Sequence, residues 1–335
     1  SGTRTVNEAP SARPPATWAL ALAFAIIYTA WGTTYYAIKL GVRDEHLPPL
    51  LFGGARIIIG GMLLLGYQWF RGAPLRLPVH DVLRLLGISW LMFVAGNGLI
   101  TYGQKTVDSS VAAVLIATTP LWIGLLTMFW PDGERLTARG WLGLVVGLGG
   151  VILLLTPKML DAEKAFNAGG FLLVLGSAAS WALGSLLMRH ARVRQSHLTA
   201  AGYQMFLGGV SMLIAGTLGG EIAELPDRVT AGAVAVFCYL LIVGSLAGFV
   251  AFNWLLGHVS AAKVGTYAYV NPLVAVLIGS AFGEELSWAL ASGMAVILFG
   301  VFLVRGGEKR TGVRGQESGV TNQGAPDSPH LIPDP

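Results

Sequence analysis

Residues 133–151 read GERLTARGWLGLVVGLGGV, and residues 283–301 read GEELSWALASGMAVILFGV. Each stretch opens with a short polar turn and continues as an apolar run of the kind that crosses a bilayer. Matched residues recur about 150 positions apart, as Glu134 and Glu284 do. A period of this length indicates that the chain contains two copies of one structural unit.

Further matches carry the duplication through both halves of the chain. Chance similarity between Gly-rich and Leu-rich helices is the alternative explanation, but matched Trp, Pro and Glu positions in constant order argue against it. The matched pairs outside the two quoted stretches include Trp31 with Trp181, Lys39 with Arg189, and Pro120 with Pro272.

The composition is that of a membrane protein. Of the 335 residues, 54% are apolar and only 12% are charged, with a mean hydropathy of +0.63, whereas soluble domains carry roughly 25% charged residues. A membrane-spanning helix needs about 20 mainly apolar residues, so we predict an all-α integral membrane protein with ten transmembrane helices. The predicted spans are residues 17–39, 49–70, 82–103, 109–130, 138–156, 168–190, 199–219, 230–256, 262–282 and 286–305.

The number of helices in each copy sets the relation between the two copies. Each copy contains five predicted helices, and because five is odd, the second copy enters the membrane from the opposite side. We therefore predict an inverted-topology repeat of the kind that secondary transporters use. The predicted organisation is a polar N-terminal lead (1–16), a first repeat (17–156), a second repeat (168–305) and a disordered C-terminal tail (306–335).

The basic residues predict the orientation of the chain. Most of the 22 Lys and Arg residues fall in the tail and in loops on the side of the N-terminus, and cytoplasmic loops carry such an excess. We expect a multi-pass protein of the bacterial inner membrane with both termini in the cytoplasm. Because this asymmetry accounts for the formal charge of +4, the expected partners are a small-molecule substrate and membrane lipids, and not nucleic acid. The oligomeric state is left open.

No residue pattern indicates catalysis or a metal. The six His residues fall in loops, at helix ends or in the tail without metal-ligand spacing, and Cys238 is the lone cysteine. An intramembrane enzyme would need a buried Ser with His, paired aspartates or a metal site. We expect no catalytic residue, no metal and no cofactor. A uniform-pore channel is a second alternative to a transporter.

Intramembrane charge is confined to one residue in this prediction. Each of the 18 Asp and Glu residues falls in a predicted loop, tail or helix end, so the membrane interior lacks the carboxylates that usually bind organic cations or carry coupling protons. Arg56 lies about two turns inside the second span. It is either a counter-charge for a substrate carboxylate or a structural residue that binds helix-end carbonyls or extends to the interface.

Polar and aromatic residues form stripes at helical spacing on four of the spans. We interpret the stripes as the lining of a central cavity in which rings hold an apolar group and amides or hydroxyls orient polar groups. Helix packing is the alternative for about half of them. Such a cavity suits a net-neutral zwitterion better than a sugar phosphate. The candidate substrate-binding residues are Tyr28, Trp31 and Tyr35 on the first span, Trp90, Asn97, Thr101 and Tyr102 on the third, Ser177 and Trp181 on the sixth, and Tyr267 and Asn271 on the ninth.

Two prolines fall near the middle of symmetry-related spans. Pro120 and Pro272 each follow a hydrogen-bonding residue, Thr119 and Asn271. Proline removes a backbone hydrogen bond and clashes with the preceding turn, so we expect a kink at each site. These kinks are either gating hinges or fixed bends that shape the bundle.

The order of these motifs resembles the drug/metabolite transporter superfamily, in particular its EamA-type exporters. The resemblance covers about residues 17–305 and implies ten helices, cytoplasmic termini and alternating access. The motifs that carry it are Trp31-Gly32, Lys39, Pro48-Pro49, Arg56, Ser109-Ser110, Thr119-Pro120 and Glu134 to Thr137 in the first half, and Gly169-Gly170, Ser180-Trp181-Ala182, Asn271-Pro272 and Gly283 to Ser287 in the second.

The resemblance also implies a function. Within this family the chain is similar to amino-acid exporters of aromatic or broad preference, so we expect a secondary transporter that exports small net-neutral metabolites, most of all amino acids. Purines, hydrophobic compounds and drugs are the alternative substrates. Thr34 stands where many relatives have Asn, and Asn271 stands where many have Glu. The second departure removes a carboxylate and favours facilitated diffusion or exchange over proton coupling.

Overall fold

The computed structural model describes residues 16–130, 136–160, 168–191, 196–256, 258–259 and 267–306. Within these ranges every regular element is a helix, which confirms the predicted all-α class. Apart from its last residue, the predicted N-terminal lead lies outside the described residues, and so does the predicted tail apart from Gly306.

The first half supplies five helical segments. Its elements are α1 (Thr17–Lys39) continued by the π-helix η1 (Leu40–Asp44), α2 (Pro49–Phe70), α3 (Val79–Ser89) continued by the π-helix η2 (Trp90–Gly98) and α4 (Leu99–Gly103), α5 (Ser109–Ile116) followed by α6 (Thr119–Thr127), and α7 (Ala138–Leu160). These runs are helical because a helix satisfies its own backbone hydrogen bonds in an apolar medium. Pro49 begins α2, where its missing N–H costs nothing.

The second half repeats this order. Its elements are α8 (Ala168–His190), α9 (His197–Leu218), the short 3-10 helix η3 (Glu221–Glu224), α10 (Ala231–Tyr239) continued by the π-helix η4 (Leu240–Ala247) and α11 (Gly248–Leu256), α13 (Tyr267–Ala281) and α14 (Trp288–Gly306). Side chains cap two of these helices, since Ser196 accepts a hydrogen bond at the start of α9 and Thr230 at the start of α10.

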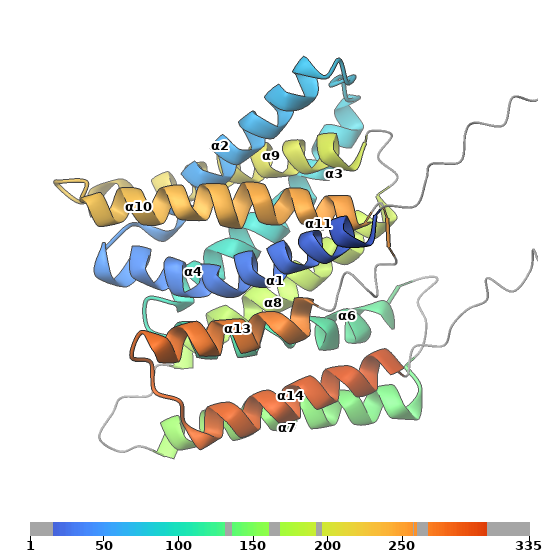
Figure 1. The fold of residues 1–335 in the computed structure, drawn as a ribbon, viewed down its shortest axis with the longest axis vertical. Helices are drawn as coiled ribbons and strands as arrows, with labels where there is room; N and C mark the ends of the chain where they lie inside the picture. Colours follow the sequence, from blue (N-terminus) through green and yellow to red (C-terminus); the bar gives the residue numbers. More distant parts are fainter. Residues whose placement is uncertain are drawn as a thin grey trace, which may run out of the picture.

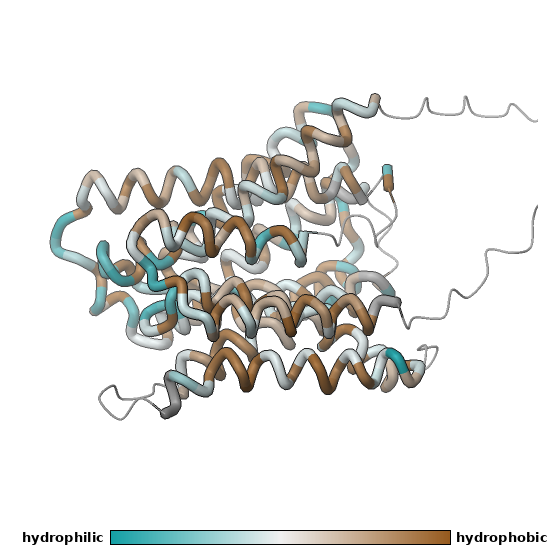
Figure 2. Tube along the Cα trace, turned by 60° about the horizontal axis from the view of Figure 1, so that its bottom comes forward, coloured by the Kyte–Doolittle hydropathy of each residue, from teal (hydrophilic) through white to brown (hydrophobic). Residues whose placement is uncertain are grey.

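The described helices have the length and composition of membrane spans. Eight segments are long and apolar enough to cross a bilayer, and two shorter apolar helices, Tyr267–Ala281 and Trp288–Val304, occupy the last two predicted spans. Figure 2 shows hydrophobic residues along the helices and the largest hydrophilic patches in loops at one end. The structure therefore agrees with the predicted ten-helix membrane fold.

The two halves pack through equivalent pairs of helices. The pair α2 and α9 lies at one edge of the bundle and the pair α7 and α14 at the other, with α1 and α8 between them (Figure 1). Helix α1 packs on η4, α11 and α13 of the second half, and α8 packs on η2, α4, α5 and α6 of the first. Small residues permit close approach, because a Cβ on Gly143 would lie only 2.6 Å from the carbonyl oxygen of Gly300.

The described acidic residues lie in loops, in terminal turns or in η3, and some are buried there. The side chain of Glu284, just after α13, is only 4% exposed. It accepts hydrogen bonds from Lys39 Nζ at 2.8 Å, from the hydroxyl of Ser109 at 2.6 Å and from the hydroxyl of Ser110. The backbone N–H groups of Ser109 and Ser110 also donate to it, at 3.0 and 2.9 Å. Burial alone would raise the pKa of Glu284, but these hydrogen bonds outweigh burial and lower it to about 2. The carboxylate thereby joins α1, α5 and the loop after α13.

Candidate substrate cavity

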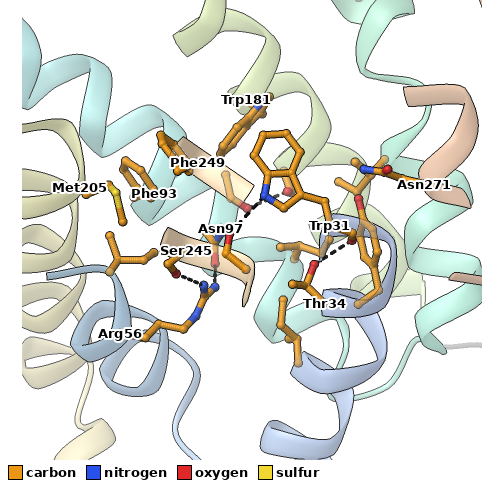
Figure 3. A pocket seen from close by; sticks show the side chains of 18 of the residues that line it. Trp31, Thr34, Arg56, Phe93, Asn97, Trp181, Met205, Ser245, Phe249 and Asn271 are labelled. Atoms are coloured by element: carbon orange, nitrogen blue, oxygen red, sulfur yellow. Dashed lines mark hydrogen bonds between the residues drawn. The ribbon is translucent and has the colours of Figure 1, made fainter. Parts of the chain in front are cut away.

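Residues from both halves enclose a cavity of about 140 Å³ in the middle of the bundle. Helices α1, α2, η2, α4 and α5 contribute from the first half, and α8, α9, η4, α11 and α13 from the second. No single helix forms the site, so the cavity depends on how the two repeats pack together. Figure 3 shows the side chains that surround it.

The structure brings eight of the residues singled out in the sequence to the wall of this cavity. They come from α1, α2, η2, α8 and α13, which are far apart in the chain. Their place in the wall is compatible with substrate binding, and their function remains a proposal. These residues are Trp31, Tyr35, Arg56, Asn97, Ser177, Trp181, Tyr267 and Asn271.

Four other candidates do not line the cavity. Tyr28 packs in a core cluster, with its ring 5.7 Å from that of Phe24. Trp90 is 50% exposed on the outer surface. Thr101 is buried and donates a hydrogen bond to the carbonyl of Asn97, and the hydroxyl of Tyr102 donates to Glu221.

The misplacement of Trp90 has a local cause. An α-helical spacing predicts Trp90 and Asn97 on one face, but residues Trp90–Gly98 form a π-helix. A π-helix bonds residue i to residue i+5, so side chains along it turn away from the faces that an α-helix would give them.

Aromatic rings form much of the cavity wall. The Trp31 ring lies 5.1 Å from Tyr267 at an interplanar angle of 88°, and 6.2 Å from Phe249. The Phe93 ring lies 6.4 Å from Trp181 and 6.1 Å from Phe249. These edge-to-face and tilted arrangements are the favourable geometries for aromatic pairs, and they connect rings of both halves into one apolar surface.

Two π-helical segments border the cavity at equivalent places in the repeats. Residues 90–98 form η2, and residues 240–247 form η4. Side chains of the central helices bond to their backbones, because Ser177 Oγ donates to the carbonyl of Gly96 at 2.7 Å and Trp31 Nε1 donates to the carbonyl of Gly244 at 3.2 Å. A side-chain hydrogen bond thus connects α8 to the backbone of η2, and another connects α1 to the backbone of η4.

Arg56 supplies a buried positive charge to the cavity. Its side chain enters between η2 and η4, and the residue is 5% exposed. Nη2 donates to Oδ1 of Asn97 at 2.7 Å and Nη1 donates to Oγ of Ser245 at 3.0 Å. Both acceptors are neutral, and within the described part of the chain no carboxylate lies within ion-pair distance of Arg56.

Several lining residues were not anticipated from the sequence. Phe93 lies four residues before Asn97, and Ser245 lies four residues before Phe249, so each pair shares a helix face. That spacing is the one signal that could have identified them. It is weak here, because apolar residues surround these positions on every face.

The two prolines shape α6 and α13 differently. Helix α5 ends at Ile116 and α6 begins at Thr119, so Pro120 lies in the first turn of a new helix. Pro272 lies inside the continuous helix α13. The described structure therefore has a helix break beside Pro120, while neither proline is among the residues that line the cavity.

A cavity between two repeated halves of an apolar helical bundle is typical of membrane transporters. The comparison with known families agrees. The chain belongs to the EamA-like transporter family, whose model matches residues 17–156 and again residues 168–306. This match confirms the resemblance seen in the sequence.

Individual relatives carry transporter names. The chain is 35% identical over 281 residues to YedA of Escherichia coli K12, which is named an uncharacterized inner membrane transporter. The matched region covers 83% of this chain and 88% of YedA. It is 29% identical over 296 residues to the uncharacterized transporter YvbV of Bacillus subtilis, over 87% of this chain and 92% of YvbV. A crystal structure with 22% sequence identity matches 88% of this chain and 100% of its own with a TM-score of 0.57, which shows a shared fold alone.

Proposed function

We propose that this protein is a secondary transporter of the inner membrane that exports small net-neutral metabolites, with amino acids of aromatic or broad type as the main substrates. Both termini face the cytoplasm in this proposal. The observation that carries it is the central cavity, which combines aromatic walls, neutral hydrogen-bonding groups and one cation.

The size of the cavity limits the substrate. One water molecule needs roughly 10–15 Å³ of cavity volume. The cavity of about 140 Å³ therefore has room for roughly ten water molecules. A substrate of about ten non-hydrogen atoms matches that space. An aromatic amino acid is of this size, and a nucleotide is much larger.

The chemistry of the wall favours a zwitterion with an apolar side chain. The rings of Trp31, Trp181 and Tyr267 suit a flat or branched apolar group, while Arg56 suits a carboxylate. A purine such as adenine also fits the volume and the rings, and it is therefore the second candidate. It would leave the charge of Arg56 without a counter-ion.

The transport mode follows from the ionisable groups in the wall. Among the described lining residues these groups are Tyr35, Arg56 and Tyr267. Arginine does not deprotonate in proteins, and tyrosine as a residue type titrates near pH 10. We propose alternating access by facilitated diffusion or exchange, because none of these groups is suited to carry a proton at neutral pH.

Counterflow in proteoliposomes tests the function. Vesicles with purified protein are loaded with unlabelled phenylalanine, leucine, adenine or glucose, and entry of the same labelled compound is followed. We expect saturable counterflow of the amino acids above that of protein-free vesicles. Counterflow of adenine alone would replace amino acids by purines as the substrate, and non-saturable entry of every compound would indicate a channel.

A further inference from the structure

The charge of Arg56 lacks compensation in the cavity. Its two described side-chain partners, Asn97 and Ser245, accept hydrogen bonds but carry no charge. Its Nε atom is buried and has no hydrogen-bond partner within the described residues. An uncompensated cation inside a membrane protein is costly, and such residues pair with an anion or mark a substrate pathway. The structure therefore presents a preformed anion site with hydrogen-bond donors still available.

We propose that Arg56 determines specificity by binding the carboxylate of the substrate. Asn97 and Ser245 are positioning residues that hold the guanidinium in the wall. This inference rests on the proposed function and narrows it. The cavity selects molecules that carry a carboxylate, so that a zwitterion binds and its carboxamide, which lacks the anionic group, is rejected.

The choice of a carboxylate follows from geometry and charge. A guanidinium presents five N–H donors in a planar fork, and a carboxylate accepts two parallel hydrogen bonds from such a fork. With only two of the nitrogens of Arg56 engaged by neutral partners, donors remain for the substrate. A phosphate has similar acceptors but carries more charge than one Arg neutralises.

This inference is tested by competition binding to the purified full chain in detergent. A binding assay is used because amines can leak across the membrane of vesicles. Labelled phenylalanine is displaced with unlabelled phenylalanine, with phenylalanine carboxamide, and with phenethylamine. These compounds share the ring and the amino group and differ at the carboxylate. We expect the carboxamide and the amine to compete at least about tenfold more weakly, because loss of a matched polar group in a buried site costs that much or more.

Variants then assign the effect to Arg56. Arg56→Gln should weaken phenylalanine binding about tenfold or more and abolish the preference for phenylalanine over its carboxamide, whereas Arg56→Lys should keep part of the preference. Ser245→Ala should reduce the affinity for phenylalanine more than that for the carboxamide. The matched control is Trp90→Ala, on the outer surface, which should bind all three compounds as the wild type does.

The outcomes separate this inference from the proposed function. Equal competition by phenylalanine and its carboxamide in the wild type would overturn the role of Arg56 and leave amino-acid transport intact, and so would an unchanged preference in Arg56→Gln. Binding of adenine without binding of any amino acid would overturn the proposed function as well. If Arg56→Gln does not fold, as judged by gel filtration, the comparison of ligands on the wild type still decides.

Discussion

Two tryptophans at the wall of the cavity show how a single residue can combine several roles. Trp31 contacts Tyr267 and Phe249 through its ring and donates its N–H to the backbone of η4. Trp181 lies at the equivalent position of the second repeat and contacts Phe93. Each residue thus closes the wall toward the opposite half of the molecule, and its removal would enlarge the cavity. Removal of Trp31 would also leave the carbonyl of Gly244 without this donor.

Truncation of these side chains is expected to lower transport without preventing folding. Trp31→Ala, Asn97→Ala, Trp181→Ala and Tyr267→Ala should each weaken substrate binding by about 1–3 kcal/mol, because a buried polar contact or ring contact is lost. The measurement is counterflow of phenylalanine at equal amounts of reconstituted protein. Trp90→Ala is the control. Wild-type counterflow in all four cavity variants would place the binding site elsewhere.

The buried carboxylate of Glu284 leads to a prediction of how the stability of the protein depends on pH. Its pKa is lowered from 4.5 to about 2 by its partners in the folded protein, so its stabilising effect is complete above pH 4.5 and disappears as the pH falls toward 2. Glu284→Gln should lower the melting temperature in detergent by a few degrees at pH 7, and should lower it less at pH 3.

The neighbouring acid provides the control for this prediction. Glu285 is exposed, and Glu285→Gln should leave the melting temperature close to that of the wild type at both pH values. An equal loss for Glu284→Gln at pH 7 and pH 3 would show that shape and not charge stabilises this contact.

At the scale of elements, the interrupted helices lie next to the cavity. The π-helices η2 and η4 both supply lining residues, and the break between α5 and α6 is near Ile116, which also lines it. Interruptions of this kind occur frequently at functional sites, because they free backbone groups and allow bending. The uninterrupted pair α7 and α14 supplies no lining residue.

The two mid-span prolines are expected to affect movement more than binding. Pro120→Ala and Pro272→Ala should slow phenylalanine counterflow several-fold while the affinity in detergent stays near that of the wild type, because a hinge alters the exchange between states and not the cavity wall. Pro157→Ala is a matched control, since Pro157 also lies inside a helix, α7, but away from the cavity. Unchanged counterflow in both variants would show that these prolines only shape the bundle.

At the scale of the whole molecule, inverted topology can be tested at equivalent loops. The loop after α2 contains Arg76, and the loop after α9 contains Asp227. The exposed Cys238 is first replaced by Ser, and a single cysteine is then introduced as Arg76→Cys or Asp227→Cys. A membrane-impermeant maleimide should label the second variant in intact cells and the first only after permeabilisation. Labelling of both from the same side would exclude inverted repeats.

The energetics of transport provide a second test for the whole molecule. An ion drives transport only if its affinity differs between the two facing states, and the described lining residues offer no carboxylate or His for a proton. Labelled phenylalanine should therefore equilibrate across vesicles without a gradient, and an imposed pH gradient should leave its final level unchanged. Accumulation well above the external level would instead establish proton coupling and direct attention to helix-end groups such as His258.

The spans and the duplication were predictable from the sequence, whereas the composition of the site was not. Apolar length and a period of about 150 residues are properties of the chain itself, and they hold whatever the helices contact. In a membrane, however, lipid and the protein interior are both apolar, so hydropathy does not reveal which face of a helix turns inward. Trp90 and Trp181 are both tryptophans of predicted spans, yet Trp90 is on the surface and Trp181 lines the cavity.

The sequence likewise left open whether Arg56 binds the substrate or has a structural role. Only the packing of the two repeats brought Asn97 and Ser245, 41 and 189 residues away in the chain, to its guanidinium, because contacts over such distances depend on how helices cross and on where π-helical turns change their faces.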